Sequence, residues 1–157
     1  SCWIRLAGRL SEAGFRIAVP AGSPEEQARA GRIVDATAEG MVLSGLGLRA
    51  LASYLTASVA AVTVDSGLGH LAAAVRTPLV SIFGPTDPGL TGIRCFDEAG
   101  HQLLVGTHLP CIPCRKRHCQ FSRDSSKIHP PCFEPITPEA TWQALRLQIE
   151  KSPQSRV

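Results

Sequence analysis

The chain has 157 residues, of which 44% are hydrophobic and 18% are charged, and its formal net charge is +3. This length and composition indicate a folded globular domain with its own core, and they exclude a disordered chain. No apolar run is long enough to cross a bilayer, and the first residues do not resemble a signal peptide.

Helix-like and strand-like segments alternate from the start of the chain to residue 83. The patterns predict helices over residues 3–13, 24–38, 47–57 and 67–75, and strands over 15–19, 41–43, 59–64 and 79–83. Ser23 is expected to cap the second helix, with Pro24 at its first position. This alternation implies a parallel sheet with helices on both faces, which is a Rossmann-like α/β fold. A last helix over residues 137–150 is assigned to core packing.

The most informative segment covers residues 65–70 (DSGLGH), between a β-branched strand and a helix rich in Ala and Leu. At such a junction, free backbone N–H groups and the positive end of the helix dipole point out of the carboxyl edge of the sheet, where anions bind. His70 would project from the first helical turn toward a bound phosphate. The alternative is a simple helix N-cap, because Asp65 and Ser66 are both good capping residues.

A second polar loop follows the next strand. Residues 84–89 (GPTDPG) are too rich in Pro and Gly to continue as a strand or a helix. Two successive strands therefore end in Gly-containing loops at one edge of the sheet, which is where open α/β folds place their ligands. Asp87 lies in this loop and could be nominated as a general base, but its Pro-flanked turn favours a capping role.

Four cysteines lie close together in the last third of the chain, with the spacing C-x2-C-x4-C-x12-C: Cys111, Cys114, Cys119 and Cys132. This pattern predicts a closed, structural site of four thiolates for zinc or, as an alternative, iron. Free thiols and disulfides are the other interpretations, and the cytosol disfavours disulfides.

The same region is basic. Residues 111–130 hold one acidic residue, Asp124, and five basic ones: Arg115, Lys116, Arg117, Arg123 and Lys127. A charge run of this kind is a solvated loop or a surface for an anionic acceptor or lipid. Nucleic acid is not expected as a partner, because Phe121 is the one aromatic residue of this segment and no nucleic-acid-binding motif accompanies it.

Two segments of the chain, together with the distance between them, resemble the ADP-heptose:lipopolysaccharide heptosyltransferases of glycosyltransferase family 9. They are residues 64–74 (VDSGLGHLAAA), followed by Pro78, and residues 83–90 (FGPTDPGL). Residues 84–90 are particularly similar to the heptosyltransferase I branch. The Cys-rich segment is more similar to the heptosyltransferase II and autotransporter heptosyltransferase branches.

The resemblance implies that residues 1–157 are the C-terminal, nucleotide-sugar-binding lobe of a GT-B glycosyltransferase, truncated at its start. Residues 95–134 would be a Cys-rich basic insertion and residues 137–150 the terminal helix of this lobe. By motif position, the donor's sugar and pyrophosphate would contact Asp65, Ser66, Gly67 and His70. Glu26 would bind the adenosine ribose and Leu46 would line the adenine site.

The resemblance also places the general base in an N-terminal lobe, so no catalytic residue is expected in this chain, and the chain alone is expected to be inactive. The implied function is transfer of heptose from ADP-heptose to a lipopolysaccharide inner-core acceptor. It would take place in the cytoplasm at the periphery of the inner membrane, without a required cofactor. The alternatives are heptosyl transfer to an autotransporter protein, another GT-B nucleotide-sugar enzyme, or an interaction module stabilised by metal at residues 95–134.

Overall fold

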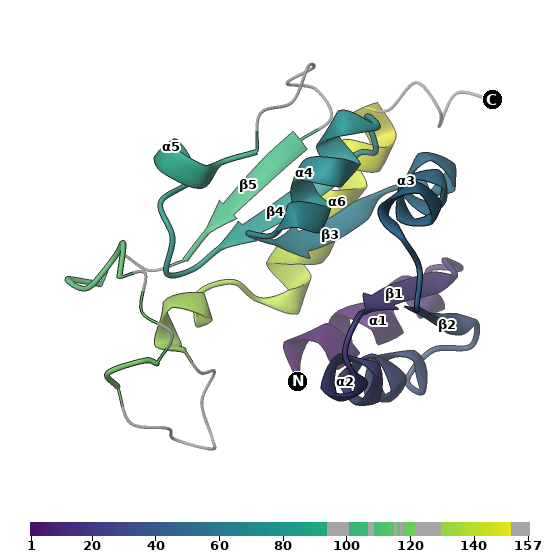
Figure 1. The fold of residues 1–157 in the computed structure, drawn as a ribbon, viewed down its shortest axis with the longest axis horizontal. Helices are drawn as coiled ribbons and strands as arrows, with labels where there is room; N and C mark the ends of the chain where they lie inside the picture. Colours follow the sequence, from purple (N-terminus) through teal and green to yellow (C-terminus); the bar gives the residue numbers. More distant parts are fainter. Residues whose placement is uncertain (94–100, 107–108, 115, 117, 122–129, 152–157) are drawn as a thin grey trace. The chain divides into compact units, whose positions relative to one another are not determined.

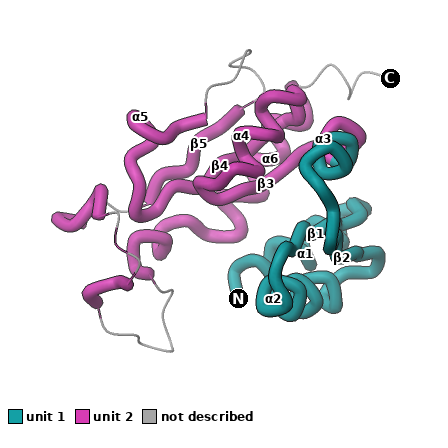
Figure 2. The backbone as a smooth tube through the Cα atoms, viewed as in Figure 1, with its two compact units in different colours: residues 1–54 teal, residues 55–157 magenta. Residues whose placement is uncertain are grey.

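The computed structural model describes residues 1–93, 101–106, 109–114, 116, 118–121 and 130–151. The chain forms two compact units, Ser1–Tyr54 and Leu55–Val157, which Figure 2 shows in different colours. Each unit contains a parallel sheet with helices packed against it. The α/β fold and the parallel strands predicted from the sequence are confirmed.

Unit 1 is built on a two-stranded parallel sheet, in which Ile17 of the first strand lies opposite Gly40 and Ala21 lies opposite Ser44. One helix packs against both strands and another against the first strand (Figure 1). The elements are α1 (Cys2–Glu12), β1 (Ile17–Ala21), α2 (Pro24–Val34), β2 (Gly40–Ser44) and α3 (Leu48–Ala57), whose last turn belongs to unit 2.

The start of α2 agrees with the prediction, and its end does not. Ser23 is the N-cap and Pro24 the first helical residue, as expected. The helix was expected to reach residue 38 but ends at Val34, because the hydroxyl of Thr37 donates to the Val34 carbonyl at 2.7 Å and turns the chain. β1 also begins two residues later than predicted, after Gly14 leaves α1 with a φ of +88°.

Unit 2 is built on a three-stranded parallel sheet in the order β3-β4-β5. The middle strand is buried along its whole length. α4 packs on β3 and β4, α6 packs on β4 and β5, and Figure 1 shows the two helices on opposite faces of the sheet. The elements are β3 (Ala61–Val64), α4 (Gly67–Ala74), β4 (Leu79–Phe83), α5 (Pro88–Thr91), β5 (His101–Val105), the 3-10 turn η2 (Pro131–Phe133) and α6 (Pro138–Lys151).

The core of unit 2 joins α4 to β4. Ala72 and Ala73 of the helix pack against Leu79 of the strand and against Ile93, which follows α5. Gly69 makes this packing possible, because a Cβ atom at that position would lie 2.6 Å from Cδ1 of Ile93. The small residues of α4 therefore let the helix approach the sheet closely. None of the helices in the described parts of the chain has the length and apolar character needed to cross a membrane.

Candidate functional site

The junction between β3 and α4 leaves polar groups unused at the carboxyl edge of the sheet. The Asp65 amide donates to the Ile82 carbonyl at 3.1 Å and so extends the pairing of β3 with β4. Ser66 is fully extended, with φ −159° and ψ 163°, and α4 begins at the next residue. Ser66 occupies the N-cap position, but its side chain makes no capping hydrogen bond. Its hydroxyl and the first N–H groups of α4 are therefore available to a ligand.

The first turn of α4 presents one side to solvent and the other to the core. A Cβ atom on Gly67 would meet nothing within 4 Å, so space is open above the start of the helix. Gly69 is buried against Ile93 and Thr63, whereas His70 is exposed. Gly67 and His70 therefore border solvent at the helix start, next to Ser66, as an anion-binding turn requires.

The Asp65 side chain has one partner on another element. The hydroxyl of Thr91, the last residue of α5, donates to Oδ2 of Asp65 at 2.9 Å. This bond joins the loop after β3 to the segment after β4. Sequence patterns gave no indication of it, because the two residues are 26 positions apart.

The loop after β4 is contacted by two residues from later in the chain, Cys114 and Phe133. The Phe133 ring lies directly against Gly84, where a Cβ atom would come within 2.5 Å of Cζ. The Cys114 amide donates to the Pro85 carbonyl at 3.1 Å. Asp87 is the N-cap of α5, and its carboxylate accepts a hydrogen bond of 2.8 Å from the Gly89 amide. The capping role predicted for Asp87 is confirmed.

Glu26 and Leu46 belong to unit 1, whereas the β3–α4 junction belongs to unit 2. Glu26 completes a capping box, in which its Oε2 accepts from the amides of Gly22 at 2.8 Å and Ser23 at 3.1 Å. These two N–H bonds lower the pKa of the Glu26 carboxyl below its ordinary value. Leu46 is half-buried in the turn between β2 and α3.

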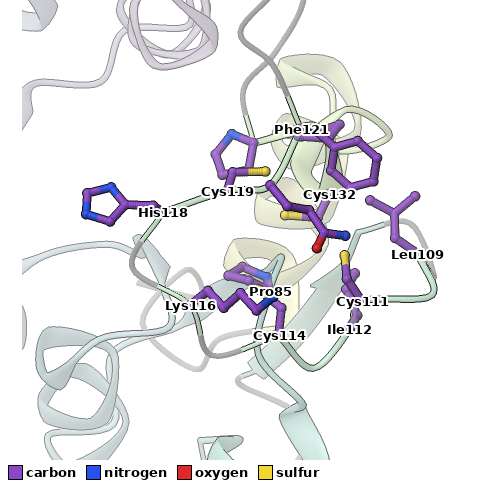
Figure 3. A pocket seen from close by; sticks show the side chains of 13 residues that line it. Pro85, Leu109, Cys111, Ile112, Cys114, Lys116, His118, Cys119, Phe121 and Cys132 are labelled. Atoms are coloured by element: carbon purple, nitrogen blue, oxygen red, sulfur yellow. The ribbon is translucent and has the colours of Figure 1, made fainter.

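The four cysteines line a single pocket beside the loop after β4, and Figure 3 shows the sulfurs of Cys111, Cys119 and Cys132 facing this space. Burial raises the pKa of the Cys132 thiol, and the three neighbouring thiols raise it further. His118 also borders the pocket, but Figure 3 shows its ring turned away from the thiols.

A structural metal site needs its four sulfurs about 2.3 Å from one ion. Among the described residues, no group of three or more His, Cys, Asp or Glu side chains has a geometry that would hold a metal ion. The sulfurs share a pocket without converging on one point, so the structure does not support the predicted zinc or iron site at Cys111, Cys114, Cys119 and Cys132.

The basic segment lies mostly outside the described residues. Lys116 is described and exposed. Arg115, Arg117, Arg123 and Lys127 fall outside the described ranges.

Comparison with known proteins shows the family. The model of glycosyltransferase family 9 (heptosyltransferase) matches residues 1–123 of the chain. The chain belongs to glycosyltransferase family 9. Among curated relatives, lipopolysaccharide heptosyltransferase 1 of Pseudomonas aeruginosa PAO1 is 38% identical over 155 residues, which cover 94% of this chain and 42% of the relative. Lipopolysaccharide heptosyltransferase 1 of Escherichia coli K12 is 42% identical over 90 residues, covering 57% of this chain and 28% of the relative.

Solved heptosyltransferase structures share the fold. The solved structure of E. coli heptosyltransferase WaaC with ADP has a TM-score of 0.71 and 28% identity, covering 96% of this chain and 38% of that one. E. coli ADP-heptose lps heptosyltransferase II has a TM-score of 0.73 at 22% identity, covering 99% of this chain and 41% of that one, and shows the fold alone. The chain thus spans about two fifths of the length of the Pseudomonas relative.

Proposed function

We propose that the intact protein transfers heptose from ADP-heptose to an acceptor in the lipopolysaccharide inner core, and that this chain binds the donor. Family membership supports the proposal, as do relatives named lipopolysaccharide heptosyltransferases and a relative solved with ADP. The observation that carries it is the β3–α4 junction, where the Ser66 hydroxyl makes no capping hydrogen bond and space is open above Gly67.

The junction suits a leaving diphosphate. The first N–H groups of α4 and about half a positive charge from its dipole would bind the pyrophosphate oxygens. Charge on the diphosphate grows as the bond to the sugar breaks, so these donors stabilise the transition state more than the bound substrate. Ser66 would add a hydroxyl donor, and His70 an imidazole N–H or, when protonated, a full charge.

Carboxylates would bind the hydroxyl groups of the donor. Asp65 is anionic and would repel phosphate, so we assign it to sugar hydroxyls. Glu26 uses Oε2 for the capping box, and we assign its Oε1 to the ribose hydroxyls. Leu46 would pack against the adenine ring.

Acceptor activation is assigned to another part of the protein. Asp87 caps α5, so we do not assign it as the general base, and we propose that the base comes from the N-terminal lobe that the family resemblance implies. The proposed transfer requires no cofactor.

We further propose that the enzyme is cytoplasmic and meets its acceptor at the inner-membrane surface, with no nucleic-acid partner. The basic residues within 111–130 would face the anionic acceptor or lipid. Charge reversal at Arg115 and Arg117 should then lower binding to vesicles of anionic lipid while leaving ADP affinity unchanged. Vesicle binding that does not respond to these changes would contradict the membrane contact.

Donor kinetics test the site directly. Ser66→Ala and His70→Ala should each weaken use of ADP-heptose by the intact protein by about 1–3 kcal/mol, as expected for losing a hydrogen bond to a charged group. Ser53→Ala is the matched control, because Ser53 lies in α3 and its hydroxyl donates to the Arg49 carbonyl of the same helix. Unchanged kinetics in both site variants would place the donor elsewhere.

Competition experiments separate the alternatives. ADP-heptose should protect the protein from unfolding and UDP-sugars should not, whereas another GT-B enzyme would show a different preference. Transfer of heptose to an autotransporter protein in place of the lipopolysaccharide core would instead favour the alternative of a protein acceptor.

A further inference from the structure

The Asp65 carboxylate accepts a hydrogen bond from the hydroxyl of Thr91 in α5. We propose that Thr91 is a positioning residue: its hydroxyl holds the Asp65 carboxylate in the plane that accepts hydrogen bonds from the sugar of the donor. The inference rests on the proposed function, since it takes Asp65 as the residue that contacts the sugar.

The hydroxyl of Thr91 has two acceptors within reach and one hydrogen to donate. Oδ2 of Asp65 lies at 2.9 Å, and the Asp87 carbonyl oxygen lies at 3.2 Å. The shorter of the two is made with the charged Asp65 carboxylate, and hydrogen bonds to ionised groups are stronger than those to neutral ones. The Asp65 backbone is fixed as well, by its N–H bond to Ile82. Both ends of the Asp65 side chain are thus held before any ligand arrives.

Thr91 itself sits on a segment that is fastened at both ends. The Asp87 carboxylate caps α5 through the Gly89 amide. At the other end, Gly92 lies so close to the Pro88 carbonyl that no side chain would fit. Ile93 is then buried in the core of unit 2 with Ala72 and Ala73 of α4. A helix of four residues would not hold a side chain in place alone, but these anchors fix where Thr91 points.

The arrangement leaves Asp65 with capacity for a ligand. A carboxylate has about four acceptor positions, and Thr91 occupies one of them on Oδ2. Among the described residues, no other side chain donates a hydrogen bond to Asp65. Oδ1 and the second position of Oδ2 remain for hydroxyl groups of the sugar. Without Thr91, the carboxylate would rotate, and binding would have to restrict that rotation.

The inference makes a selective prediction, because the diphosphate and adenosine do not depend on Asp65. In the intact protein without acceptor, calorimetric titration should show that Thr91→Val weakens ADP-heptose binding about three- to tenfold. This is the range for the net contribution of one ordinary hydrogen bond, because Thr91 acts on the sugar only through Asp65. ADP affinity should change less than twofold. Thr91→Ser keeps the hydroxyl and should restore ADP-heptose affinity to within twofold of the wild type.

Asp65→Ala separates this inference from the proposed function. If Asp65→Ala removes the preference for ADP-heptose over ADP and Thr91→Val does not reduce it, the positioning role is wrong and the donor site stands. If Asp65→Ala leaves the preference intact, the sugar contact assigned to Asp65 is wrong, and the inference falls with it.

A double variant tests the route of the effect. Adding Thr91→Val to Asp65→Ala should cause no further loss of ADP-heptose affinity, because Thr91 acts through Asp65. Additive losses would overturn the proposal, as would an equal weakening of ADP and ADP-heptose, which would indicate a general effect on the fold. Thr91→Ala replaces Thr91→Val if the valine variant does not fold.

Discussion

Glu26 is a residue with two assignments, one seen in the structure and one proposed. Its Oε2 closes the capping box at the start of α2, and the amides of Gly22 and Ser23 lower the pKa of its carboxyl. Because the folded pKa lies below the ordinary value, the charged form is favoured by folding. The stabilisation is fully present above the ordinary glutamate value of 4.5 and is lost as the pH falls through the lower folded pKa.

Glu26→Gln tests this charge effect. Glutamine can still accept the capping bonds, so the variant removes the charge and keeps the shape of the cap. We expect the variant to unfold at lower urea concentration than the wild type at pH 7, and the difference to disappear in acid below the folded pKa. Urea unfolding midpoints measured across this pH range give the answer. A difference of equal size at pH 7 and in acid would show that the charge is not responsible.

Local capping residues were predictable because their partners are near in sequence. Ser23, Pro24 and Asp87 are all placed as the sequence indicated, since each capping interaction closes within a few positions. The bond between Thr91 and Asp65 was not predictable, because it depends on how two loops after different strands meet. Ser66 is a third case. Its sequence position was compatible with a helix cap or with ligand binding, and in the structure its hydroxyl makes no hydrogen bond that caps α4.

At the scale of elements, the turn η2 supports the loop after β4. The Phe133 ring fills the space where a side chain at position 84 would lie. Cys132 of the same turn is buried, and its carbonyl oxygen lies against Gly106, just after β5. The Cys-rich region therefore contacts the ends of β4 and β5 at two glycines, through the Phe133 ring at Gly84 and the Cys132 carbonyl at Gly106.

Gly84→Ala should disturb this contact. The added methyl group would lie 2.5 Å from the Phe133 ring, and overpacking of this kind costs about 1–3 kcal/mol of unfolding free energy. Gly31→Ala in α2 is the control, because its Cβ would meet nothing within 4 Å and alanine stabilises a helix interior by about 0.5–1 kcal/mol relative to glycine. Thermal unfolding of both variants measures the contrast.

A double variant of Gly84 and Phe133 tests whether these two residues press on one another. Phe133→Leu alone loses ring contacts, but combined with Gly84→Ala it should cost less than the sum of the two single changes, since the smaller side chain leaves room for the methyl group. Strictly additive costs would show that the two residues do not press on one another.

Most elements were predicted because they follow hydrophobic periodicity, and β5 shows where that signal fails. Its sequence HQLLV begins with two polar residues. His101 is nevertheless half-buried, with Nε2 3.0 Å from the hydroxyl of buried Ser81, and Gln102 is bonded by Gln148 of α6 at 3.3 Å. Polar side chains with partners on a neighbouring strand or a packed helix interrupt the alternation of apolar and polar residues that predicts a strand. Residues 101–105 are for this reason predicted as part of an insertion and not as a strand.

At the scale of the whole molecule, the fold followed from the alternation of helix and strand patterns. The family resemblance followed from two segments, residues 64–74 and 83–90, that together cover a small part of the chain. Both surround the carboxyl ends of β3 and β4 in unit 2. The division into two units near residue 54 was not predicted, because α3 continues across it with an unbroken helical pattern.

We expect residues 1–157 alone to transfer no heptose. The general base and the acceptor surface are proposed to belong to the N-terminal lobe that the family resemblance implies, and the chain spans about two fifths of the length of its Pseudomonas relative. Holding two reactants in the correct geometry lowers a barrier by about 7 kcal/mol or more, and a donor-binding lobe alone cannot supply that. Transfer from ADP-heptose to a lipopolysaccharide core acceptor should be measurable with the intact protein and absent with the purified chain. Transfer by the chain alone would mean that it contains its own base, and the carboxylates at the edge of the sheet, Asp65 first, would then have to be tested for that role.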